Sequence, residues 1–408
     1  MKYIYLGLII FMMSYGVKQN ENLQAGEWQA KLFREDGNHI IFNFEVINSG
    51  DSLHWIIKNG EEQIQVDDIT IKGDSILVAM PVFESYFKLV KKGNNQLSGI
   101  WTKAATAGFI DMPFEALAGT ATRFETNDQP IANISGKWEV TFFRADGSPR
   151  PAIAEFVQQG KTLSGTFITP TGDYRYLYGI VDGDRVKLST FDGSHAYYFN
   201  ATINSDTSIT NGHYYSGATS IEPWKAVKND KATLPDVAAM FLKEGEERLD
   251  FIFPDLNGNT VSINDNRFKN KVVIVQIMGS WCPNCMDETA FLSEYYRKNK
   301  ERGVEVVALA YEYYEDPVLA GNSVRKFQKR FNVQYPMLLT GVTVSDTLRT
   351  EKTLPQLTKI KSFPSTIFID KQGKVAKIHA GFEGPGTGSR YELLKKEFEA
   401  TIDKLLKK

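Results

Sequence analysis

The sequence predicts a protein of several domains, with two antiparallel all-β modules followed by one α/β domain. Three observations support this prediction. A unit of about 110 residues occurs twice in the first half of the chain, each copy alternates apolar and polar residues between turn signals, and strand-like and helix-like segments alternate in the second half. At 408 residues the chain is also too long for one ordinary hydrophobic core.

The first residues predict export. Met1-Lys2 is followed at residues 4–17 by an apolar run without charge, which is shorter than the ~20 residues that a membrane span needs. We therefore expect residues 1–17 to be a secretory signal peptide, with Ser14-x-Gly16 as its cleavage site. An uncleaved anchor or a buried helix is the alternative. No later segment is apolar for long enough to span a membrane, so we expect no stable span in the mature chain.

Composition and charge narrow the class of protein and the partners that we expect for it. Hydrophobic residues make up 42% of the chain and charged residues 24%, which is typical of a folded globular protein. The formal net charge is -2 and the chain has no long basic block. We therefore do not expect nucleic acid as a partner.

The two β-modules are expected at residues 24–124 and 134–229. The sequence GEWQAKLFREDG at residues 26–37 matches GKWEVTFFRADG at residues 136–147, an offset of 136 − 26 = 110. Each unit reads as about eight short strands, which favours a barrel or a sandwich. The Gly-x-Trp opening resembles that of calycin-type barrels. The many aromatic residues either fill these modules or line a ligand site.

The α/β domain is expected at residues 236–408. Its most informative segment is KVVIVQIM at residues 271–278, a continuous apolar and β-branched run typical of a strand buried on both faces. The full order that we expect is a short helix at 236–243, a hairpin at 251–263, the strand at 271–278, a helix at 283–297, a strand at 304–313, a helix at 323–331, a strand at 335–339, a mostly helical stretch at 344–359, a hairpin of 365–370 with 374–382, and a helix at 391–406.

The only two cysteines of the chain, Cys282 and Cys285, are three positions apart. A bridge between them would close almost no loop, so it would remove little entropy from the unfolded chain and is a poor structural crosslink. Two cysteines supply half of a zinc site, and the only histidine of this domain, His379, is far along the sequence. Redox chemistry is therefore favoured over structural zinc and over a copper-handling role, and we expect no metal and no cofactor.

The position of the cysteines favours reactivity. Cys282 follows the buried strand and is expected at the N-cap of a helix, with Pro283 in the first turn. Free backbone N–H groups and the positive end of the helix dipole stabilise a thiolate there. Cys285 follows one turn later on the same face, so its sulfur can reach that of Cys282 and resolve a mixed disulfide.

The region from about residue 249 to 408 resembles the TlpA/ResA-like class of exported thioredoxin-fold thiol–disulfide oxidoreductases. The resemblance rests on FPDLNGNTVSI, KVVIVQIM, Trp281-Cys282-x-x-Cys285-x-x-Glu288 and Phe363-Pro364-Ser365-Thr366. It implies a cis bond before Pro364, which lies opposite the dithiol. It also implies a set of site residues, which are Cys282 as nucleophile, Cys285 as resolving thiol and Glu288 as an acid beside them, with Trp281, Pro283, Phe363 and Pro364 in the substrate-binding surface.

Two positions depart from the class. Asn284 stands before the second cysteine, where a proline is usual, so the redox poise is not defined by the motif. Gln276 stands where thioredoxins carry a buried acid, so Glu288 or water must move the proton.

These observations predict an exported reductase of protein disulfides in the periplasm of a Gram-negative bacterium. The resemblance implies protein thiols and disulfides as substrates and a membrane-embedded thiol protein as electron donor. Two alternatives stay open. The β-modules could be a ligand- or partner-binding protein with an accessory thioredoxin domain, or the same thiols could reduce peroxides.

Overall fold

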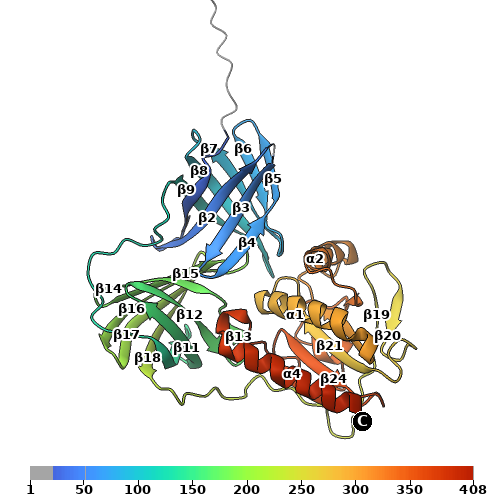
Figure 1. Cartoon of the computed structure of the whole chain (residues 1–408). Helices are drawn as coiled ribbons and strands as arrows, with labels where there is room; N and C mark the ends of the chain where they lie inside the picture. The colour runs from blue at the N-terminus through green and yellow to red at the C-terminus, as the bar shows by residue number, and fades with distance from the viewer. Residues whose placement is uncertain (1–21, 51, 408) are drawn as a thin grey trace, which may run out of the picture.

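The computed structural model describes residues 22–50 and 52–407, and the expected signal peptide at residues 1–17 lies outside the described residues. Two β-rich units and one α/β unit lie against one another (Figure 1). The fold class expected from the sequence, two antiparallel β-modules followed by a thioredoxin-fold domain, is confirmed. In the described part of the chain no helix is both long and apolar enough to cross a membrane.

The first module is an antiparallel sheet of nine strands that curls into a nearly closed barrel. Its strands are β1 Gly26–Phe33, β2 His39–Ser49, β3 Ser52–Asn59, β4 Glu62–Val66, β5 Asp68–Lys72, β6 Ser75–Ala79, β7 Ser85–Lys91, β8 Gln96–Ala105 and β9 Gly108–Ala118. β1 pairs with both β2 and β9, so the first and last strands of the module are neighbours. The module has one strand more than the eight expected from the sequence.

The second module repeats this arrangement and closes its ring. Its strands are β10 Gly136–Phe143, β11 Pro149–Gln159, β12 Thr162–Thr169, β13 Gly172–Asp173, β14 Leu177–Asp182, β15 Arg185–Phe191, β16 Ala196–Ser205, β17 Ser208–Ser216 and β18 Ser220–Lys228. β11 pairs with β12 as well as with β10, which closes the barrel, and the two-residue strand β13 is appended to β12.

The Gly-x-Trp opening has the same structural role in both modules. The indole N–H of Trp28 donates to the backbone oxygen of Gln24, and that of Trp138 donates to the backbone oxygen of Ile134, each at 2.9 Å. Both indoles are fully buried among other aromatic side chains. The repeated tripeptide therefore anchors the strand that follows the chain's entry into each barrel.

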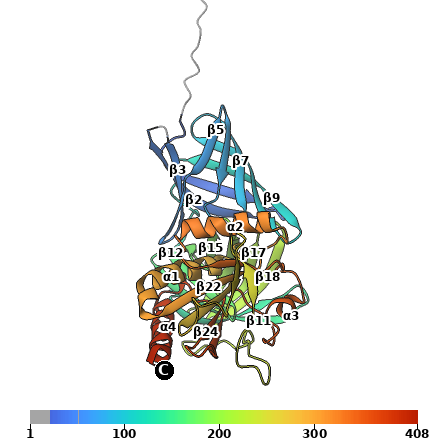
Figure 2. The ribbon, with the colours of Figure 1, turned by 90° about the vertical axis from the view of Figure 1, so that its right-hand side faces the viewer.

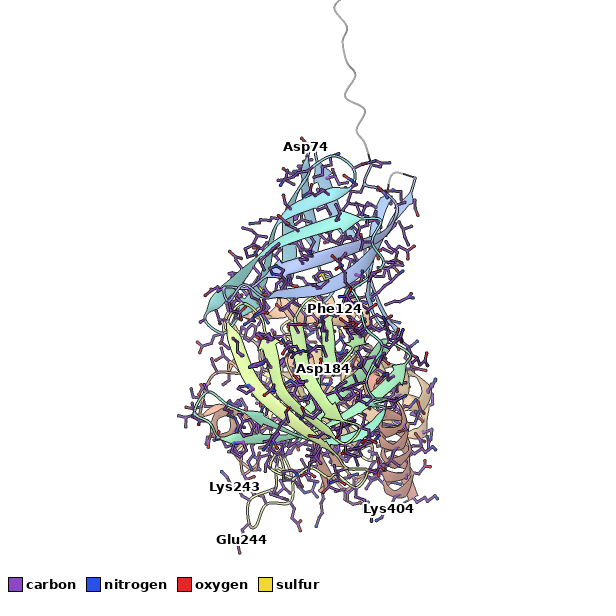
Figure 3. All side chains as sticks on the ribbon, turned by 90° about the vertical axis from the view of Figure 1, so that its left-hand side faces the viewer. Asp74, Phe124, Asp184, Lys243, Glu244 and Lys404 are labelled. Atoms are coloured by element: carbon purple, nitrogen blue, oxygen red, sulfur yellow. The ribbon has the colours of Figure 1, made fainter. Side chains whose placement is uncertain are left out.

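The two modules share side chains where they meet. Phe191, at the end of β15, is fully buried in the core of the first module, where its ring stacks on Phe42 at 4.3 Å. The side chain of Asn59 pairs with the backbone N–H and oxygen of Phe191. Phe124, in the segment between the modules, lies where the two barrels meet (Figure 3), and its ring packs on Tyr198. Apolar packing and hydrogen bonds therefore both join the two barrels.

The α/β domain has a five-stranded mixed sheet in the order β23-β22-β21-β24-β25 and a separate hairpin of β19 with β20. Its elements are β19 Ile252–Pro254, β20 Thr260–Ser262, β21 Val272–Met278, α1 Pro283–Asn299, the 3-10 turn Lys300–Arg302, β22 Val304–Ala310, α2 Pro317–Arg330, β23 Met337–Leu339, α3 Arg349–Thr353, β24 Ser365–Ile369, β25 Val375–Ala380, the 3-10 turn Pro385–Thr387 and α4 Ser389–Lys407. All seven residues of β21 are buried, as its sequence predicts.

The two faces of this sheet are covered differently. Val272 and Ile274 of β21 share a core with residues of α1, α2 and α4, whereas Val273 and Val275 pack against the β19–β20 hairpin and the segment after α3. α2 also lies against the first module (Figure 2), where Phe327 meets Phe83 with ring centroids 6.3 Å apart.

Two expectations about helices are wrong. The segment 236–243 is not helical, because its backbone bonds across the domain instead, with Lys243 N–H donating to Gln356 and Thr358 N–H to Phe241. The stretch 344–359 contains only the single helical turn of α3. In both segments tertiary contacts decide the conformation over the weak local preference for helix.

Candidate active site

The two cysteines lie where β21 passes into α1. Cys282 has an extended backbone (φ -101°, ψ 115°) and caps the helix, and Pro283 is the first helical residue, as the sequence predicts. The backbone N–H of Cys285 donates to the Cys282 sulfur at 3.2 Å. A backbone donor of the helix N-terminus thus points at the Cys282 sulfur.

The two thiols have different surroundings. Both are free, and Cys282 keeps 4% of its surface exposed while Cys285 keeps none. Burial, and after it the contact with Cys282, raises the pKa of the Cys285 thiol well above its usual range. Cys282 is therefore the sulfur that an incoming group can meet first, and Cys285 is held as a thiol behind it.

The Phe363-Pro364 loop lies opposite the dithiol, and the peptide bond between its two residues is cis, as the resemblance implies. The Cys282 sulfur lies 3.6 Å from the backbone oxygen of Phe363. Trp281 packs edge-on against Phe363 and stacks on Tyr313, with ring centroids 5.4 and 5.6 Å apart. Trp281 and Phe363 are half-buried, whereas Pro283 and Pro364 are buried.

Glu288 lies inside the domain rather than on the surface of α1, and only 1% of it is exposed. Its carboxylate accepts hydrogen bonds from the Gln276 amide at 2.9 Å and from the Thr366 hydroxyl. Burial raises the pKa of Glu288 to about 7, although both hydrogen bonds act in the opposite direction. The negative charge of Glu288 is in turn one of the causes that raise the pKa of Cys285. Gln276 stands where thioredoxins carry a buried acid. In this chain its amide donates a hydrogen bond to a different buried acid, Glu288.

A second buried acid was missed by the sequence analysis. Glu312 accepts hydrogen bonds from the backbone N–H of Ser280 at 2.8 Å and from its hydroxyl at 2.5 Å. Burial raises the pKa of Glu312 to about 7. Glu312 follows β22, which is parallel to β21, so both chain ends leave the sheet at the same edge. Because parallel strands end at the same edge of a sheet, the strand order could have placed Glu312 near the turn that precedes the cysteines.

The second module supplies charged groups that nothing in the sequence pointed to. The guanidinium of Arg175 binds both carboxylate oxygens of Asp287 in α1, at 2.8 and 3.0 Å. The carboxylate of Asp173 accepts a hydrogen bond from the side chain of Asn284, between the two cysteines, at 3.3 Å. Among the described residues no group of three or more His, Cys, Asp or Glu side chains is placed to hold a metal ion.

The chemistry available at this site is that of two sulfurs, one at a helix N-terminus and one buried behind it. On a mixed sheet of this order, with a cis-proline loop opposite, that arrangement defines the class of thioredoxin-fold oxidoreductases. The protein-family description that matches the chain is Redoxin, over residues 231–394, which begins just after the last strand of the second module.

Relatives place the chain more narrowly. The thiol-disulfide oxidoreductase ResA of Bacillus thuringiensis subsp. konkukian is 30% identical over 131 residues, which are 32% of this chain and 66% of that protein. ResA of Geobacillus kaustophilus is 30% identical over 137 residues, 34% of this chain and 69% of that protein. The chain belongs to the family of thiol–disulfide oxidoreductases that ResA represents. A thioredoxin-family thiol:disulfide interchange protein of Chlorobium tepidum aligns with 40% of this chain and 98% of its own at 19% identity, with a TM-score of 0.30.

Proposed function

We propose that this protein is an exported reductase of protein disulfides that acts in the periplasm of a Gram-negative bacterium. The observation that carries the proposal is the pairing of an N-cap sulfur with a buried thiol one turn later, since Cys285 N–H donates to the Cys282 sulfur and Cys285 itself is fully buried. A nucleophile and a resolving thiol are the two parts that disulfide exchange requires.

The reaction proceeds in two exchanges. The Cys282 thiolate attacks one sulfur of the substrate disulfide, the substrate S–S bond breaks, and the second substrate sulfur leaves as a thiolate that takes up a proton. Cys285 then loses its proton and attacks the Cys282 sulfur, which breaks the mixed disulfide and releases the first substrate sulfur as a thiolate that takes up a proton. Two electrons pass to the substrate, and the Cys282–Cys285 pair is left as a disulfide.

Glu288 serves the second exchange in this proposal. Cys285 must lose a proton inside the domain, and Glu288 is the buried acid whose charge acts on it. While Glu288 is ionised, it favours the protonated form of Cys285 and so keeps that thiol in reserve. Protonation of Glu288 would remove this effect and ease the attack of Cys285 on the mixed disulfide.

The dithiol must be restored by a second thiol protein, because the described residues include no other cysteine. The apolar, uncharged run at residues 4–17 supports an exported protein. We infer that a membrane-embedded thiol protein donates the electrons, since such a donor can carry them across the membrane to an exported reductase.

The test compares the full chain with its Cys282→Ser variant in the reduction of insulin disulfides by dithiothreitol. We expect the wild-type chain to accelerate the reaction and the variant to lose the acceleration entirely, because the nucleophile is gone. Equal rates would overturn the proposal. Robust turnover with hydrogen peroxide in place of insulin would favour a thiol peroxidase instead.

A ligand site inside the β-modules finds no support in their cores. The large aromatic residues of both barrels are fully buried against one another, including Trp55, Trp101 and Trp224. The cleft of about 1110 Å³ near the modules lies outside both barrels, between them and the start of α4. The barrel interiors therefore offer no room for a ligand.

A further inference from the structure

Both β-modules cover the dithiol face of the thioredoxin domain. Cys282 keeps 4% of its surface exposed and Cys285 none. The hydroxyl of Ser194, in the second module, donates to the backbone oxygen of Trp281 at 3.3 Å. Lys103, in the first module, donates to the backbone oxygen of Ser194 at 2.8 Å. Residues of both modules therefore meet over the residue that precedes Cys282.

Little space is left at this junction. A cavity of about 20 Å³ remains beside Trp281, and it is lined by residues of all three units, among them Phe83, Gly193 and Tyr313. A single water needs about 10–15 Å³ of such volume. A polypeptide that carries a disulfide does not fit between the modules and Trp281.

A loop of the second module, residues 171–175, covers the dithiol from another side. The hydroxyl of Ser362, in the loop that holds the cis-proline, donates to the backbone oxygen of Thr171 at 3.4 Å. A β-carbon added at Gly172 would lie 2.9 Å from the side-chain oxygen of Asn284. The loop thus touches both Asn284, which lies between the cysteines, and the segment opposite them.

Asp173 fixes the same loop in place. Its buried carboxylate accepts hydrogen bonds from the backbone N–H of Gly384 at 2.7 Å and from the Asn284 amide at 3.3 Å. Burial, with the charge of Asp287 second, raises the pKa of Asp173 to about 7. The loop is therefore hydrogen-bonded to the thioredoxin domain at two places, Asn284 in the first turn of α1 and Gly384 before α4.

Arg175 ties all three units together at the end of this loop. Its buried guanidinium pairs with Asp287 of α1 at 2.8 Å, with Asp192 of the second module at 3.0 Å and with Glu62 of the first module at 2.6 Å. Removing one member of a buried, hydrogen-bonded ion cluster is strongly unfavourable, because the remaining charges stay desolvated without a partner. Arg175 is therefore the residue on which closure of the three units depends most.

We propose that the two β-modules form a cap over the dithiol, that the cap must move away before a disulfide of another protein can reach Cys282, and that Arg175 holds it closed. This inference rests on the proposed function, because it concerns access of a protein disulfide to the same sulfur. Attack on a disulfide requires the Cys282 sulfur to approach one substrate sulfur in line with the S–S bond, and the closed arrangement leaves no room for that.

The test measures access to Cys282 without any turnover. In a Cys285→Ser chain Cys282 is the only thiol, so covalent labelling by a polyethylene-glycol maleimide reports on it alone. We compare the labelling rate of this chain with that of the same chain carrying Arg175→Gln, and divide each rate by the thiolate fraction measured from ultraviolet absorbance. We expect Arg175→Gln to raise the corrected rate by about tenfold or more, because the open form becomes more populated.

The matched control is Arg185→Gln, which removes an exposed arginine of the same module. Arg185 has 60% of its side chain exposed and lies 3.6 Å from Asp184, which is 49% exposed, so the rate should stay within about twofold of the parent. Circular dichroism establishes whether each variant keeps its fold. If Arg175→Gln does not fold, Gly172→Ala replaces it, because its added methyl group displaces the loop from Asn284 without changing any charge.

Folded variants that label no faster than the parent would overturn the cap. So would a parent chain whose Cys282 already reacts as fast as it does in urea. The proposed function fails separately: if the opened variants with both cysteines label quickly but still reduce no insulin, the cap stands and the reductase does not.

Discussion

Replacing Glu288 by glutamine should change how the stability of the thioredoxin domain depends on pH. Glutamine keeps the size of the side chain and can still bond to Gln276 and Thr366, so the main change is the loss of a titrating group. Burial raises the pKa of Glu288 to about 7 from its ordinary 4.5. The native state therefore holds a proton that the unfolded chain releases at lower pH.

The sign and the size follow from this difference. A carboxyl whose native pKa is raised contributes its full stability below pH 4.5, and this contribution is lost as the pH rises through about 7. At about 1.4 kcal/mol for each pH unit between the two values, the whole loss is about 3 kcal/mol, and most of it falls between pH 5 and pH 8. Glu288→Gln removes this part only. Glu312 and Asp173, which also titrate near pH 7, keep their own contributions in both proteins.

The assay must report on one domain of three, because unfolding of the whole chain is not a single transition. Of the six tryptophans only Trp281 lies in the thioredoxin domain, so a fluorine-labelled tryptophan signal assigned to Trp281 follows that domain in urea. We expect the difference in unfolding free energy between Glu288→Gln and wild type to shift in favour of the variant by about 2–3 kcal/mol from pH 5 to pH 8.

The control for this experiment lies on the same helix. Glu294 is exposed and pairs with Lys298, which lowers its pKa, so Glu294→Gln should leave the dependence between pH 5 and pH 8 unchanged. If the unfolding free energies of the wild type and of Glu288→Gln change with pH in parallel across this range, Glu288 does not titrate there. The reasoning from its burial would then be refuted.

Two further predictions concern the dithiol and the second barrel. Cys285→Ser should trap substrate proteins as mixed disulfides on Cys282, visible as reducible adducts on a non-reducing gel, and a Cys282→Ser chain that forms the same adducts would contradict the assignment of roles. Gly165→Ala should destabilise the second module by about 2–4 kcal/mol in urea unfolding followed by its own tryptophans, because the added β-carbon would lie 2.2 Å from the backbone oxygen of Glu155 at a φ of +155°. Gly160→Ala, at a φ of +60° with open space around it, should cost only about 1 kcal/mol, and equal losses at both sites would show that close approach is not the cause.

The sequence predicts local features well where pattern and chemistry agree. The buried strand at residues 271–278, the helix that opens at Pro283 and the N-cap position of Cys282 follow from hydrophobic runs and capping rules, and all three are confirmed. The helix expected at residues 236–243 does not form, because the backbone of this segment bonds to residues 356–358, more than a hundred positions away. No local pattern contains that information.

The same limit applies to the site. Cys282 and Cys285 could be proposed as site residues from their spacing. Arg175 and Asp173 could not, because they belong to a different module and lie in a loop without a recognisable motif. Glu312 is an intermediate case. The strand expected at residues 304–313 included Glu312, whereas the observed strand β22 ends at Ala310 and leaves Glu312 in the segment that follows, beside Ser280.

Asn284, one of the two residues between the cysteines, is in direct contact with the second module. Asn284 donates to Asp173, and Gly172 lies so close to it that even one added methyl group on the glycine would collide. A proline at position 284 would lose this hydrogen bond, and a larger side chain would press against the loop at residues 171–175. Packing against the second module therefore restricts residue 284 in addition to thiol chemistry. Any effect of residue 284 on the dithiol therefore includes its contacts with the second module.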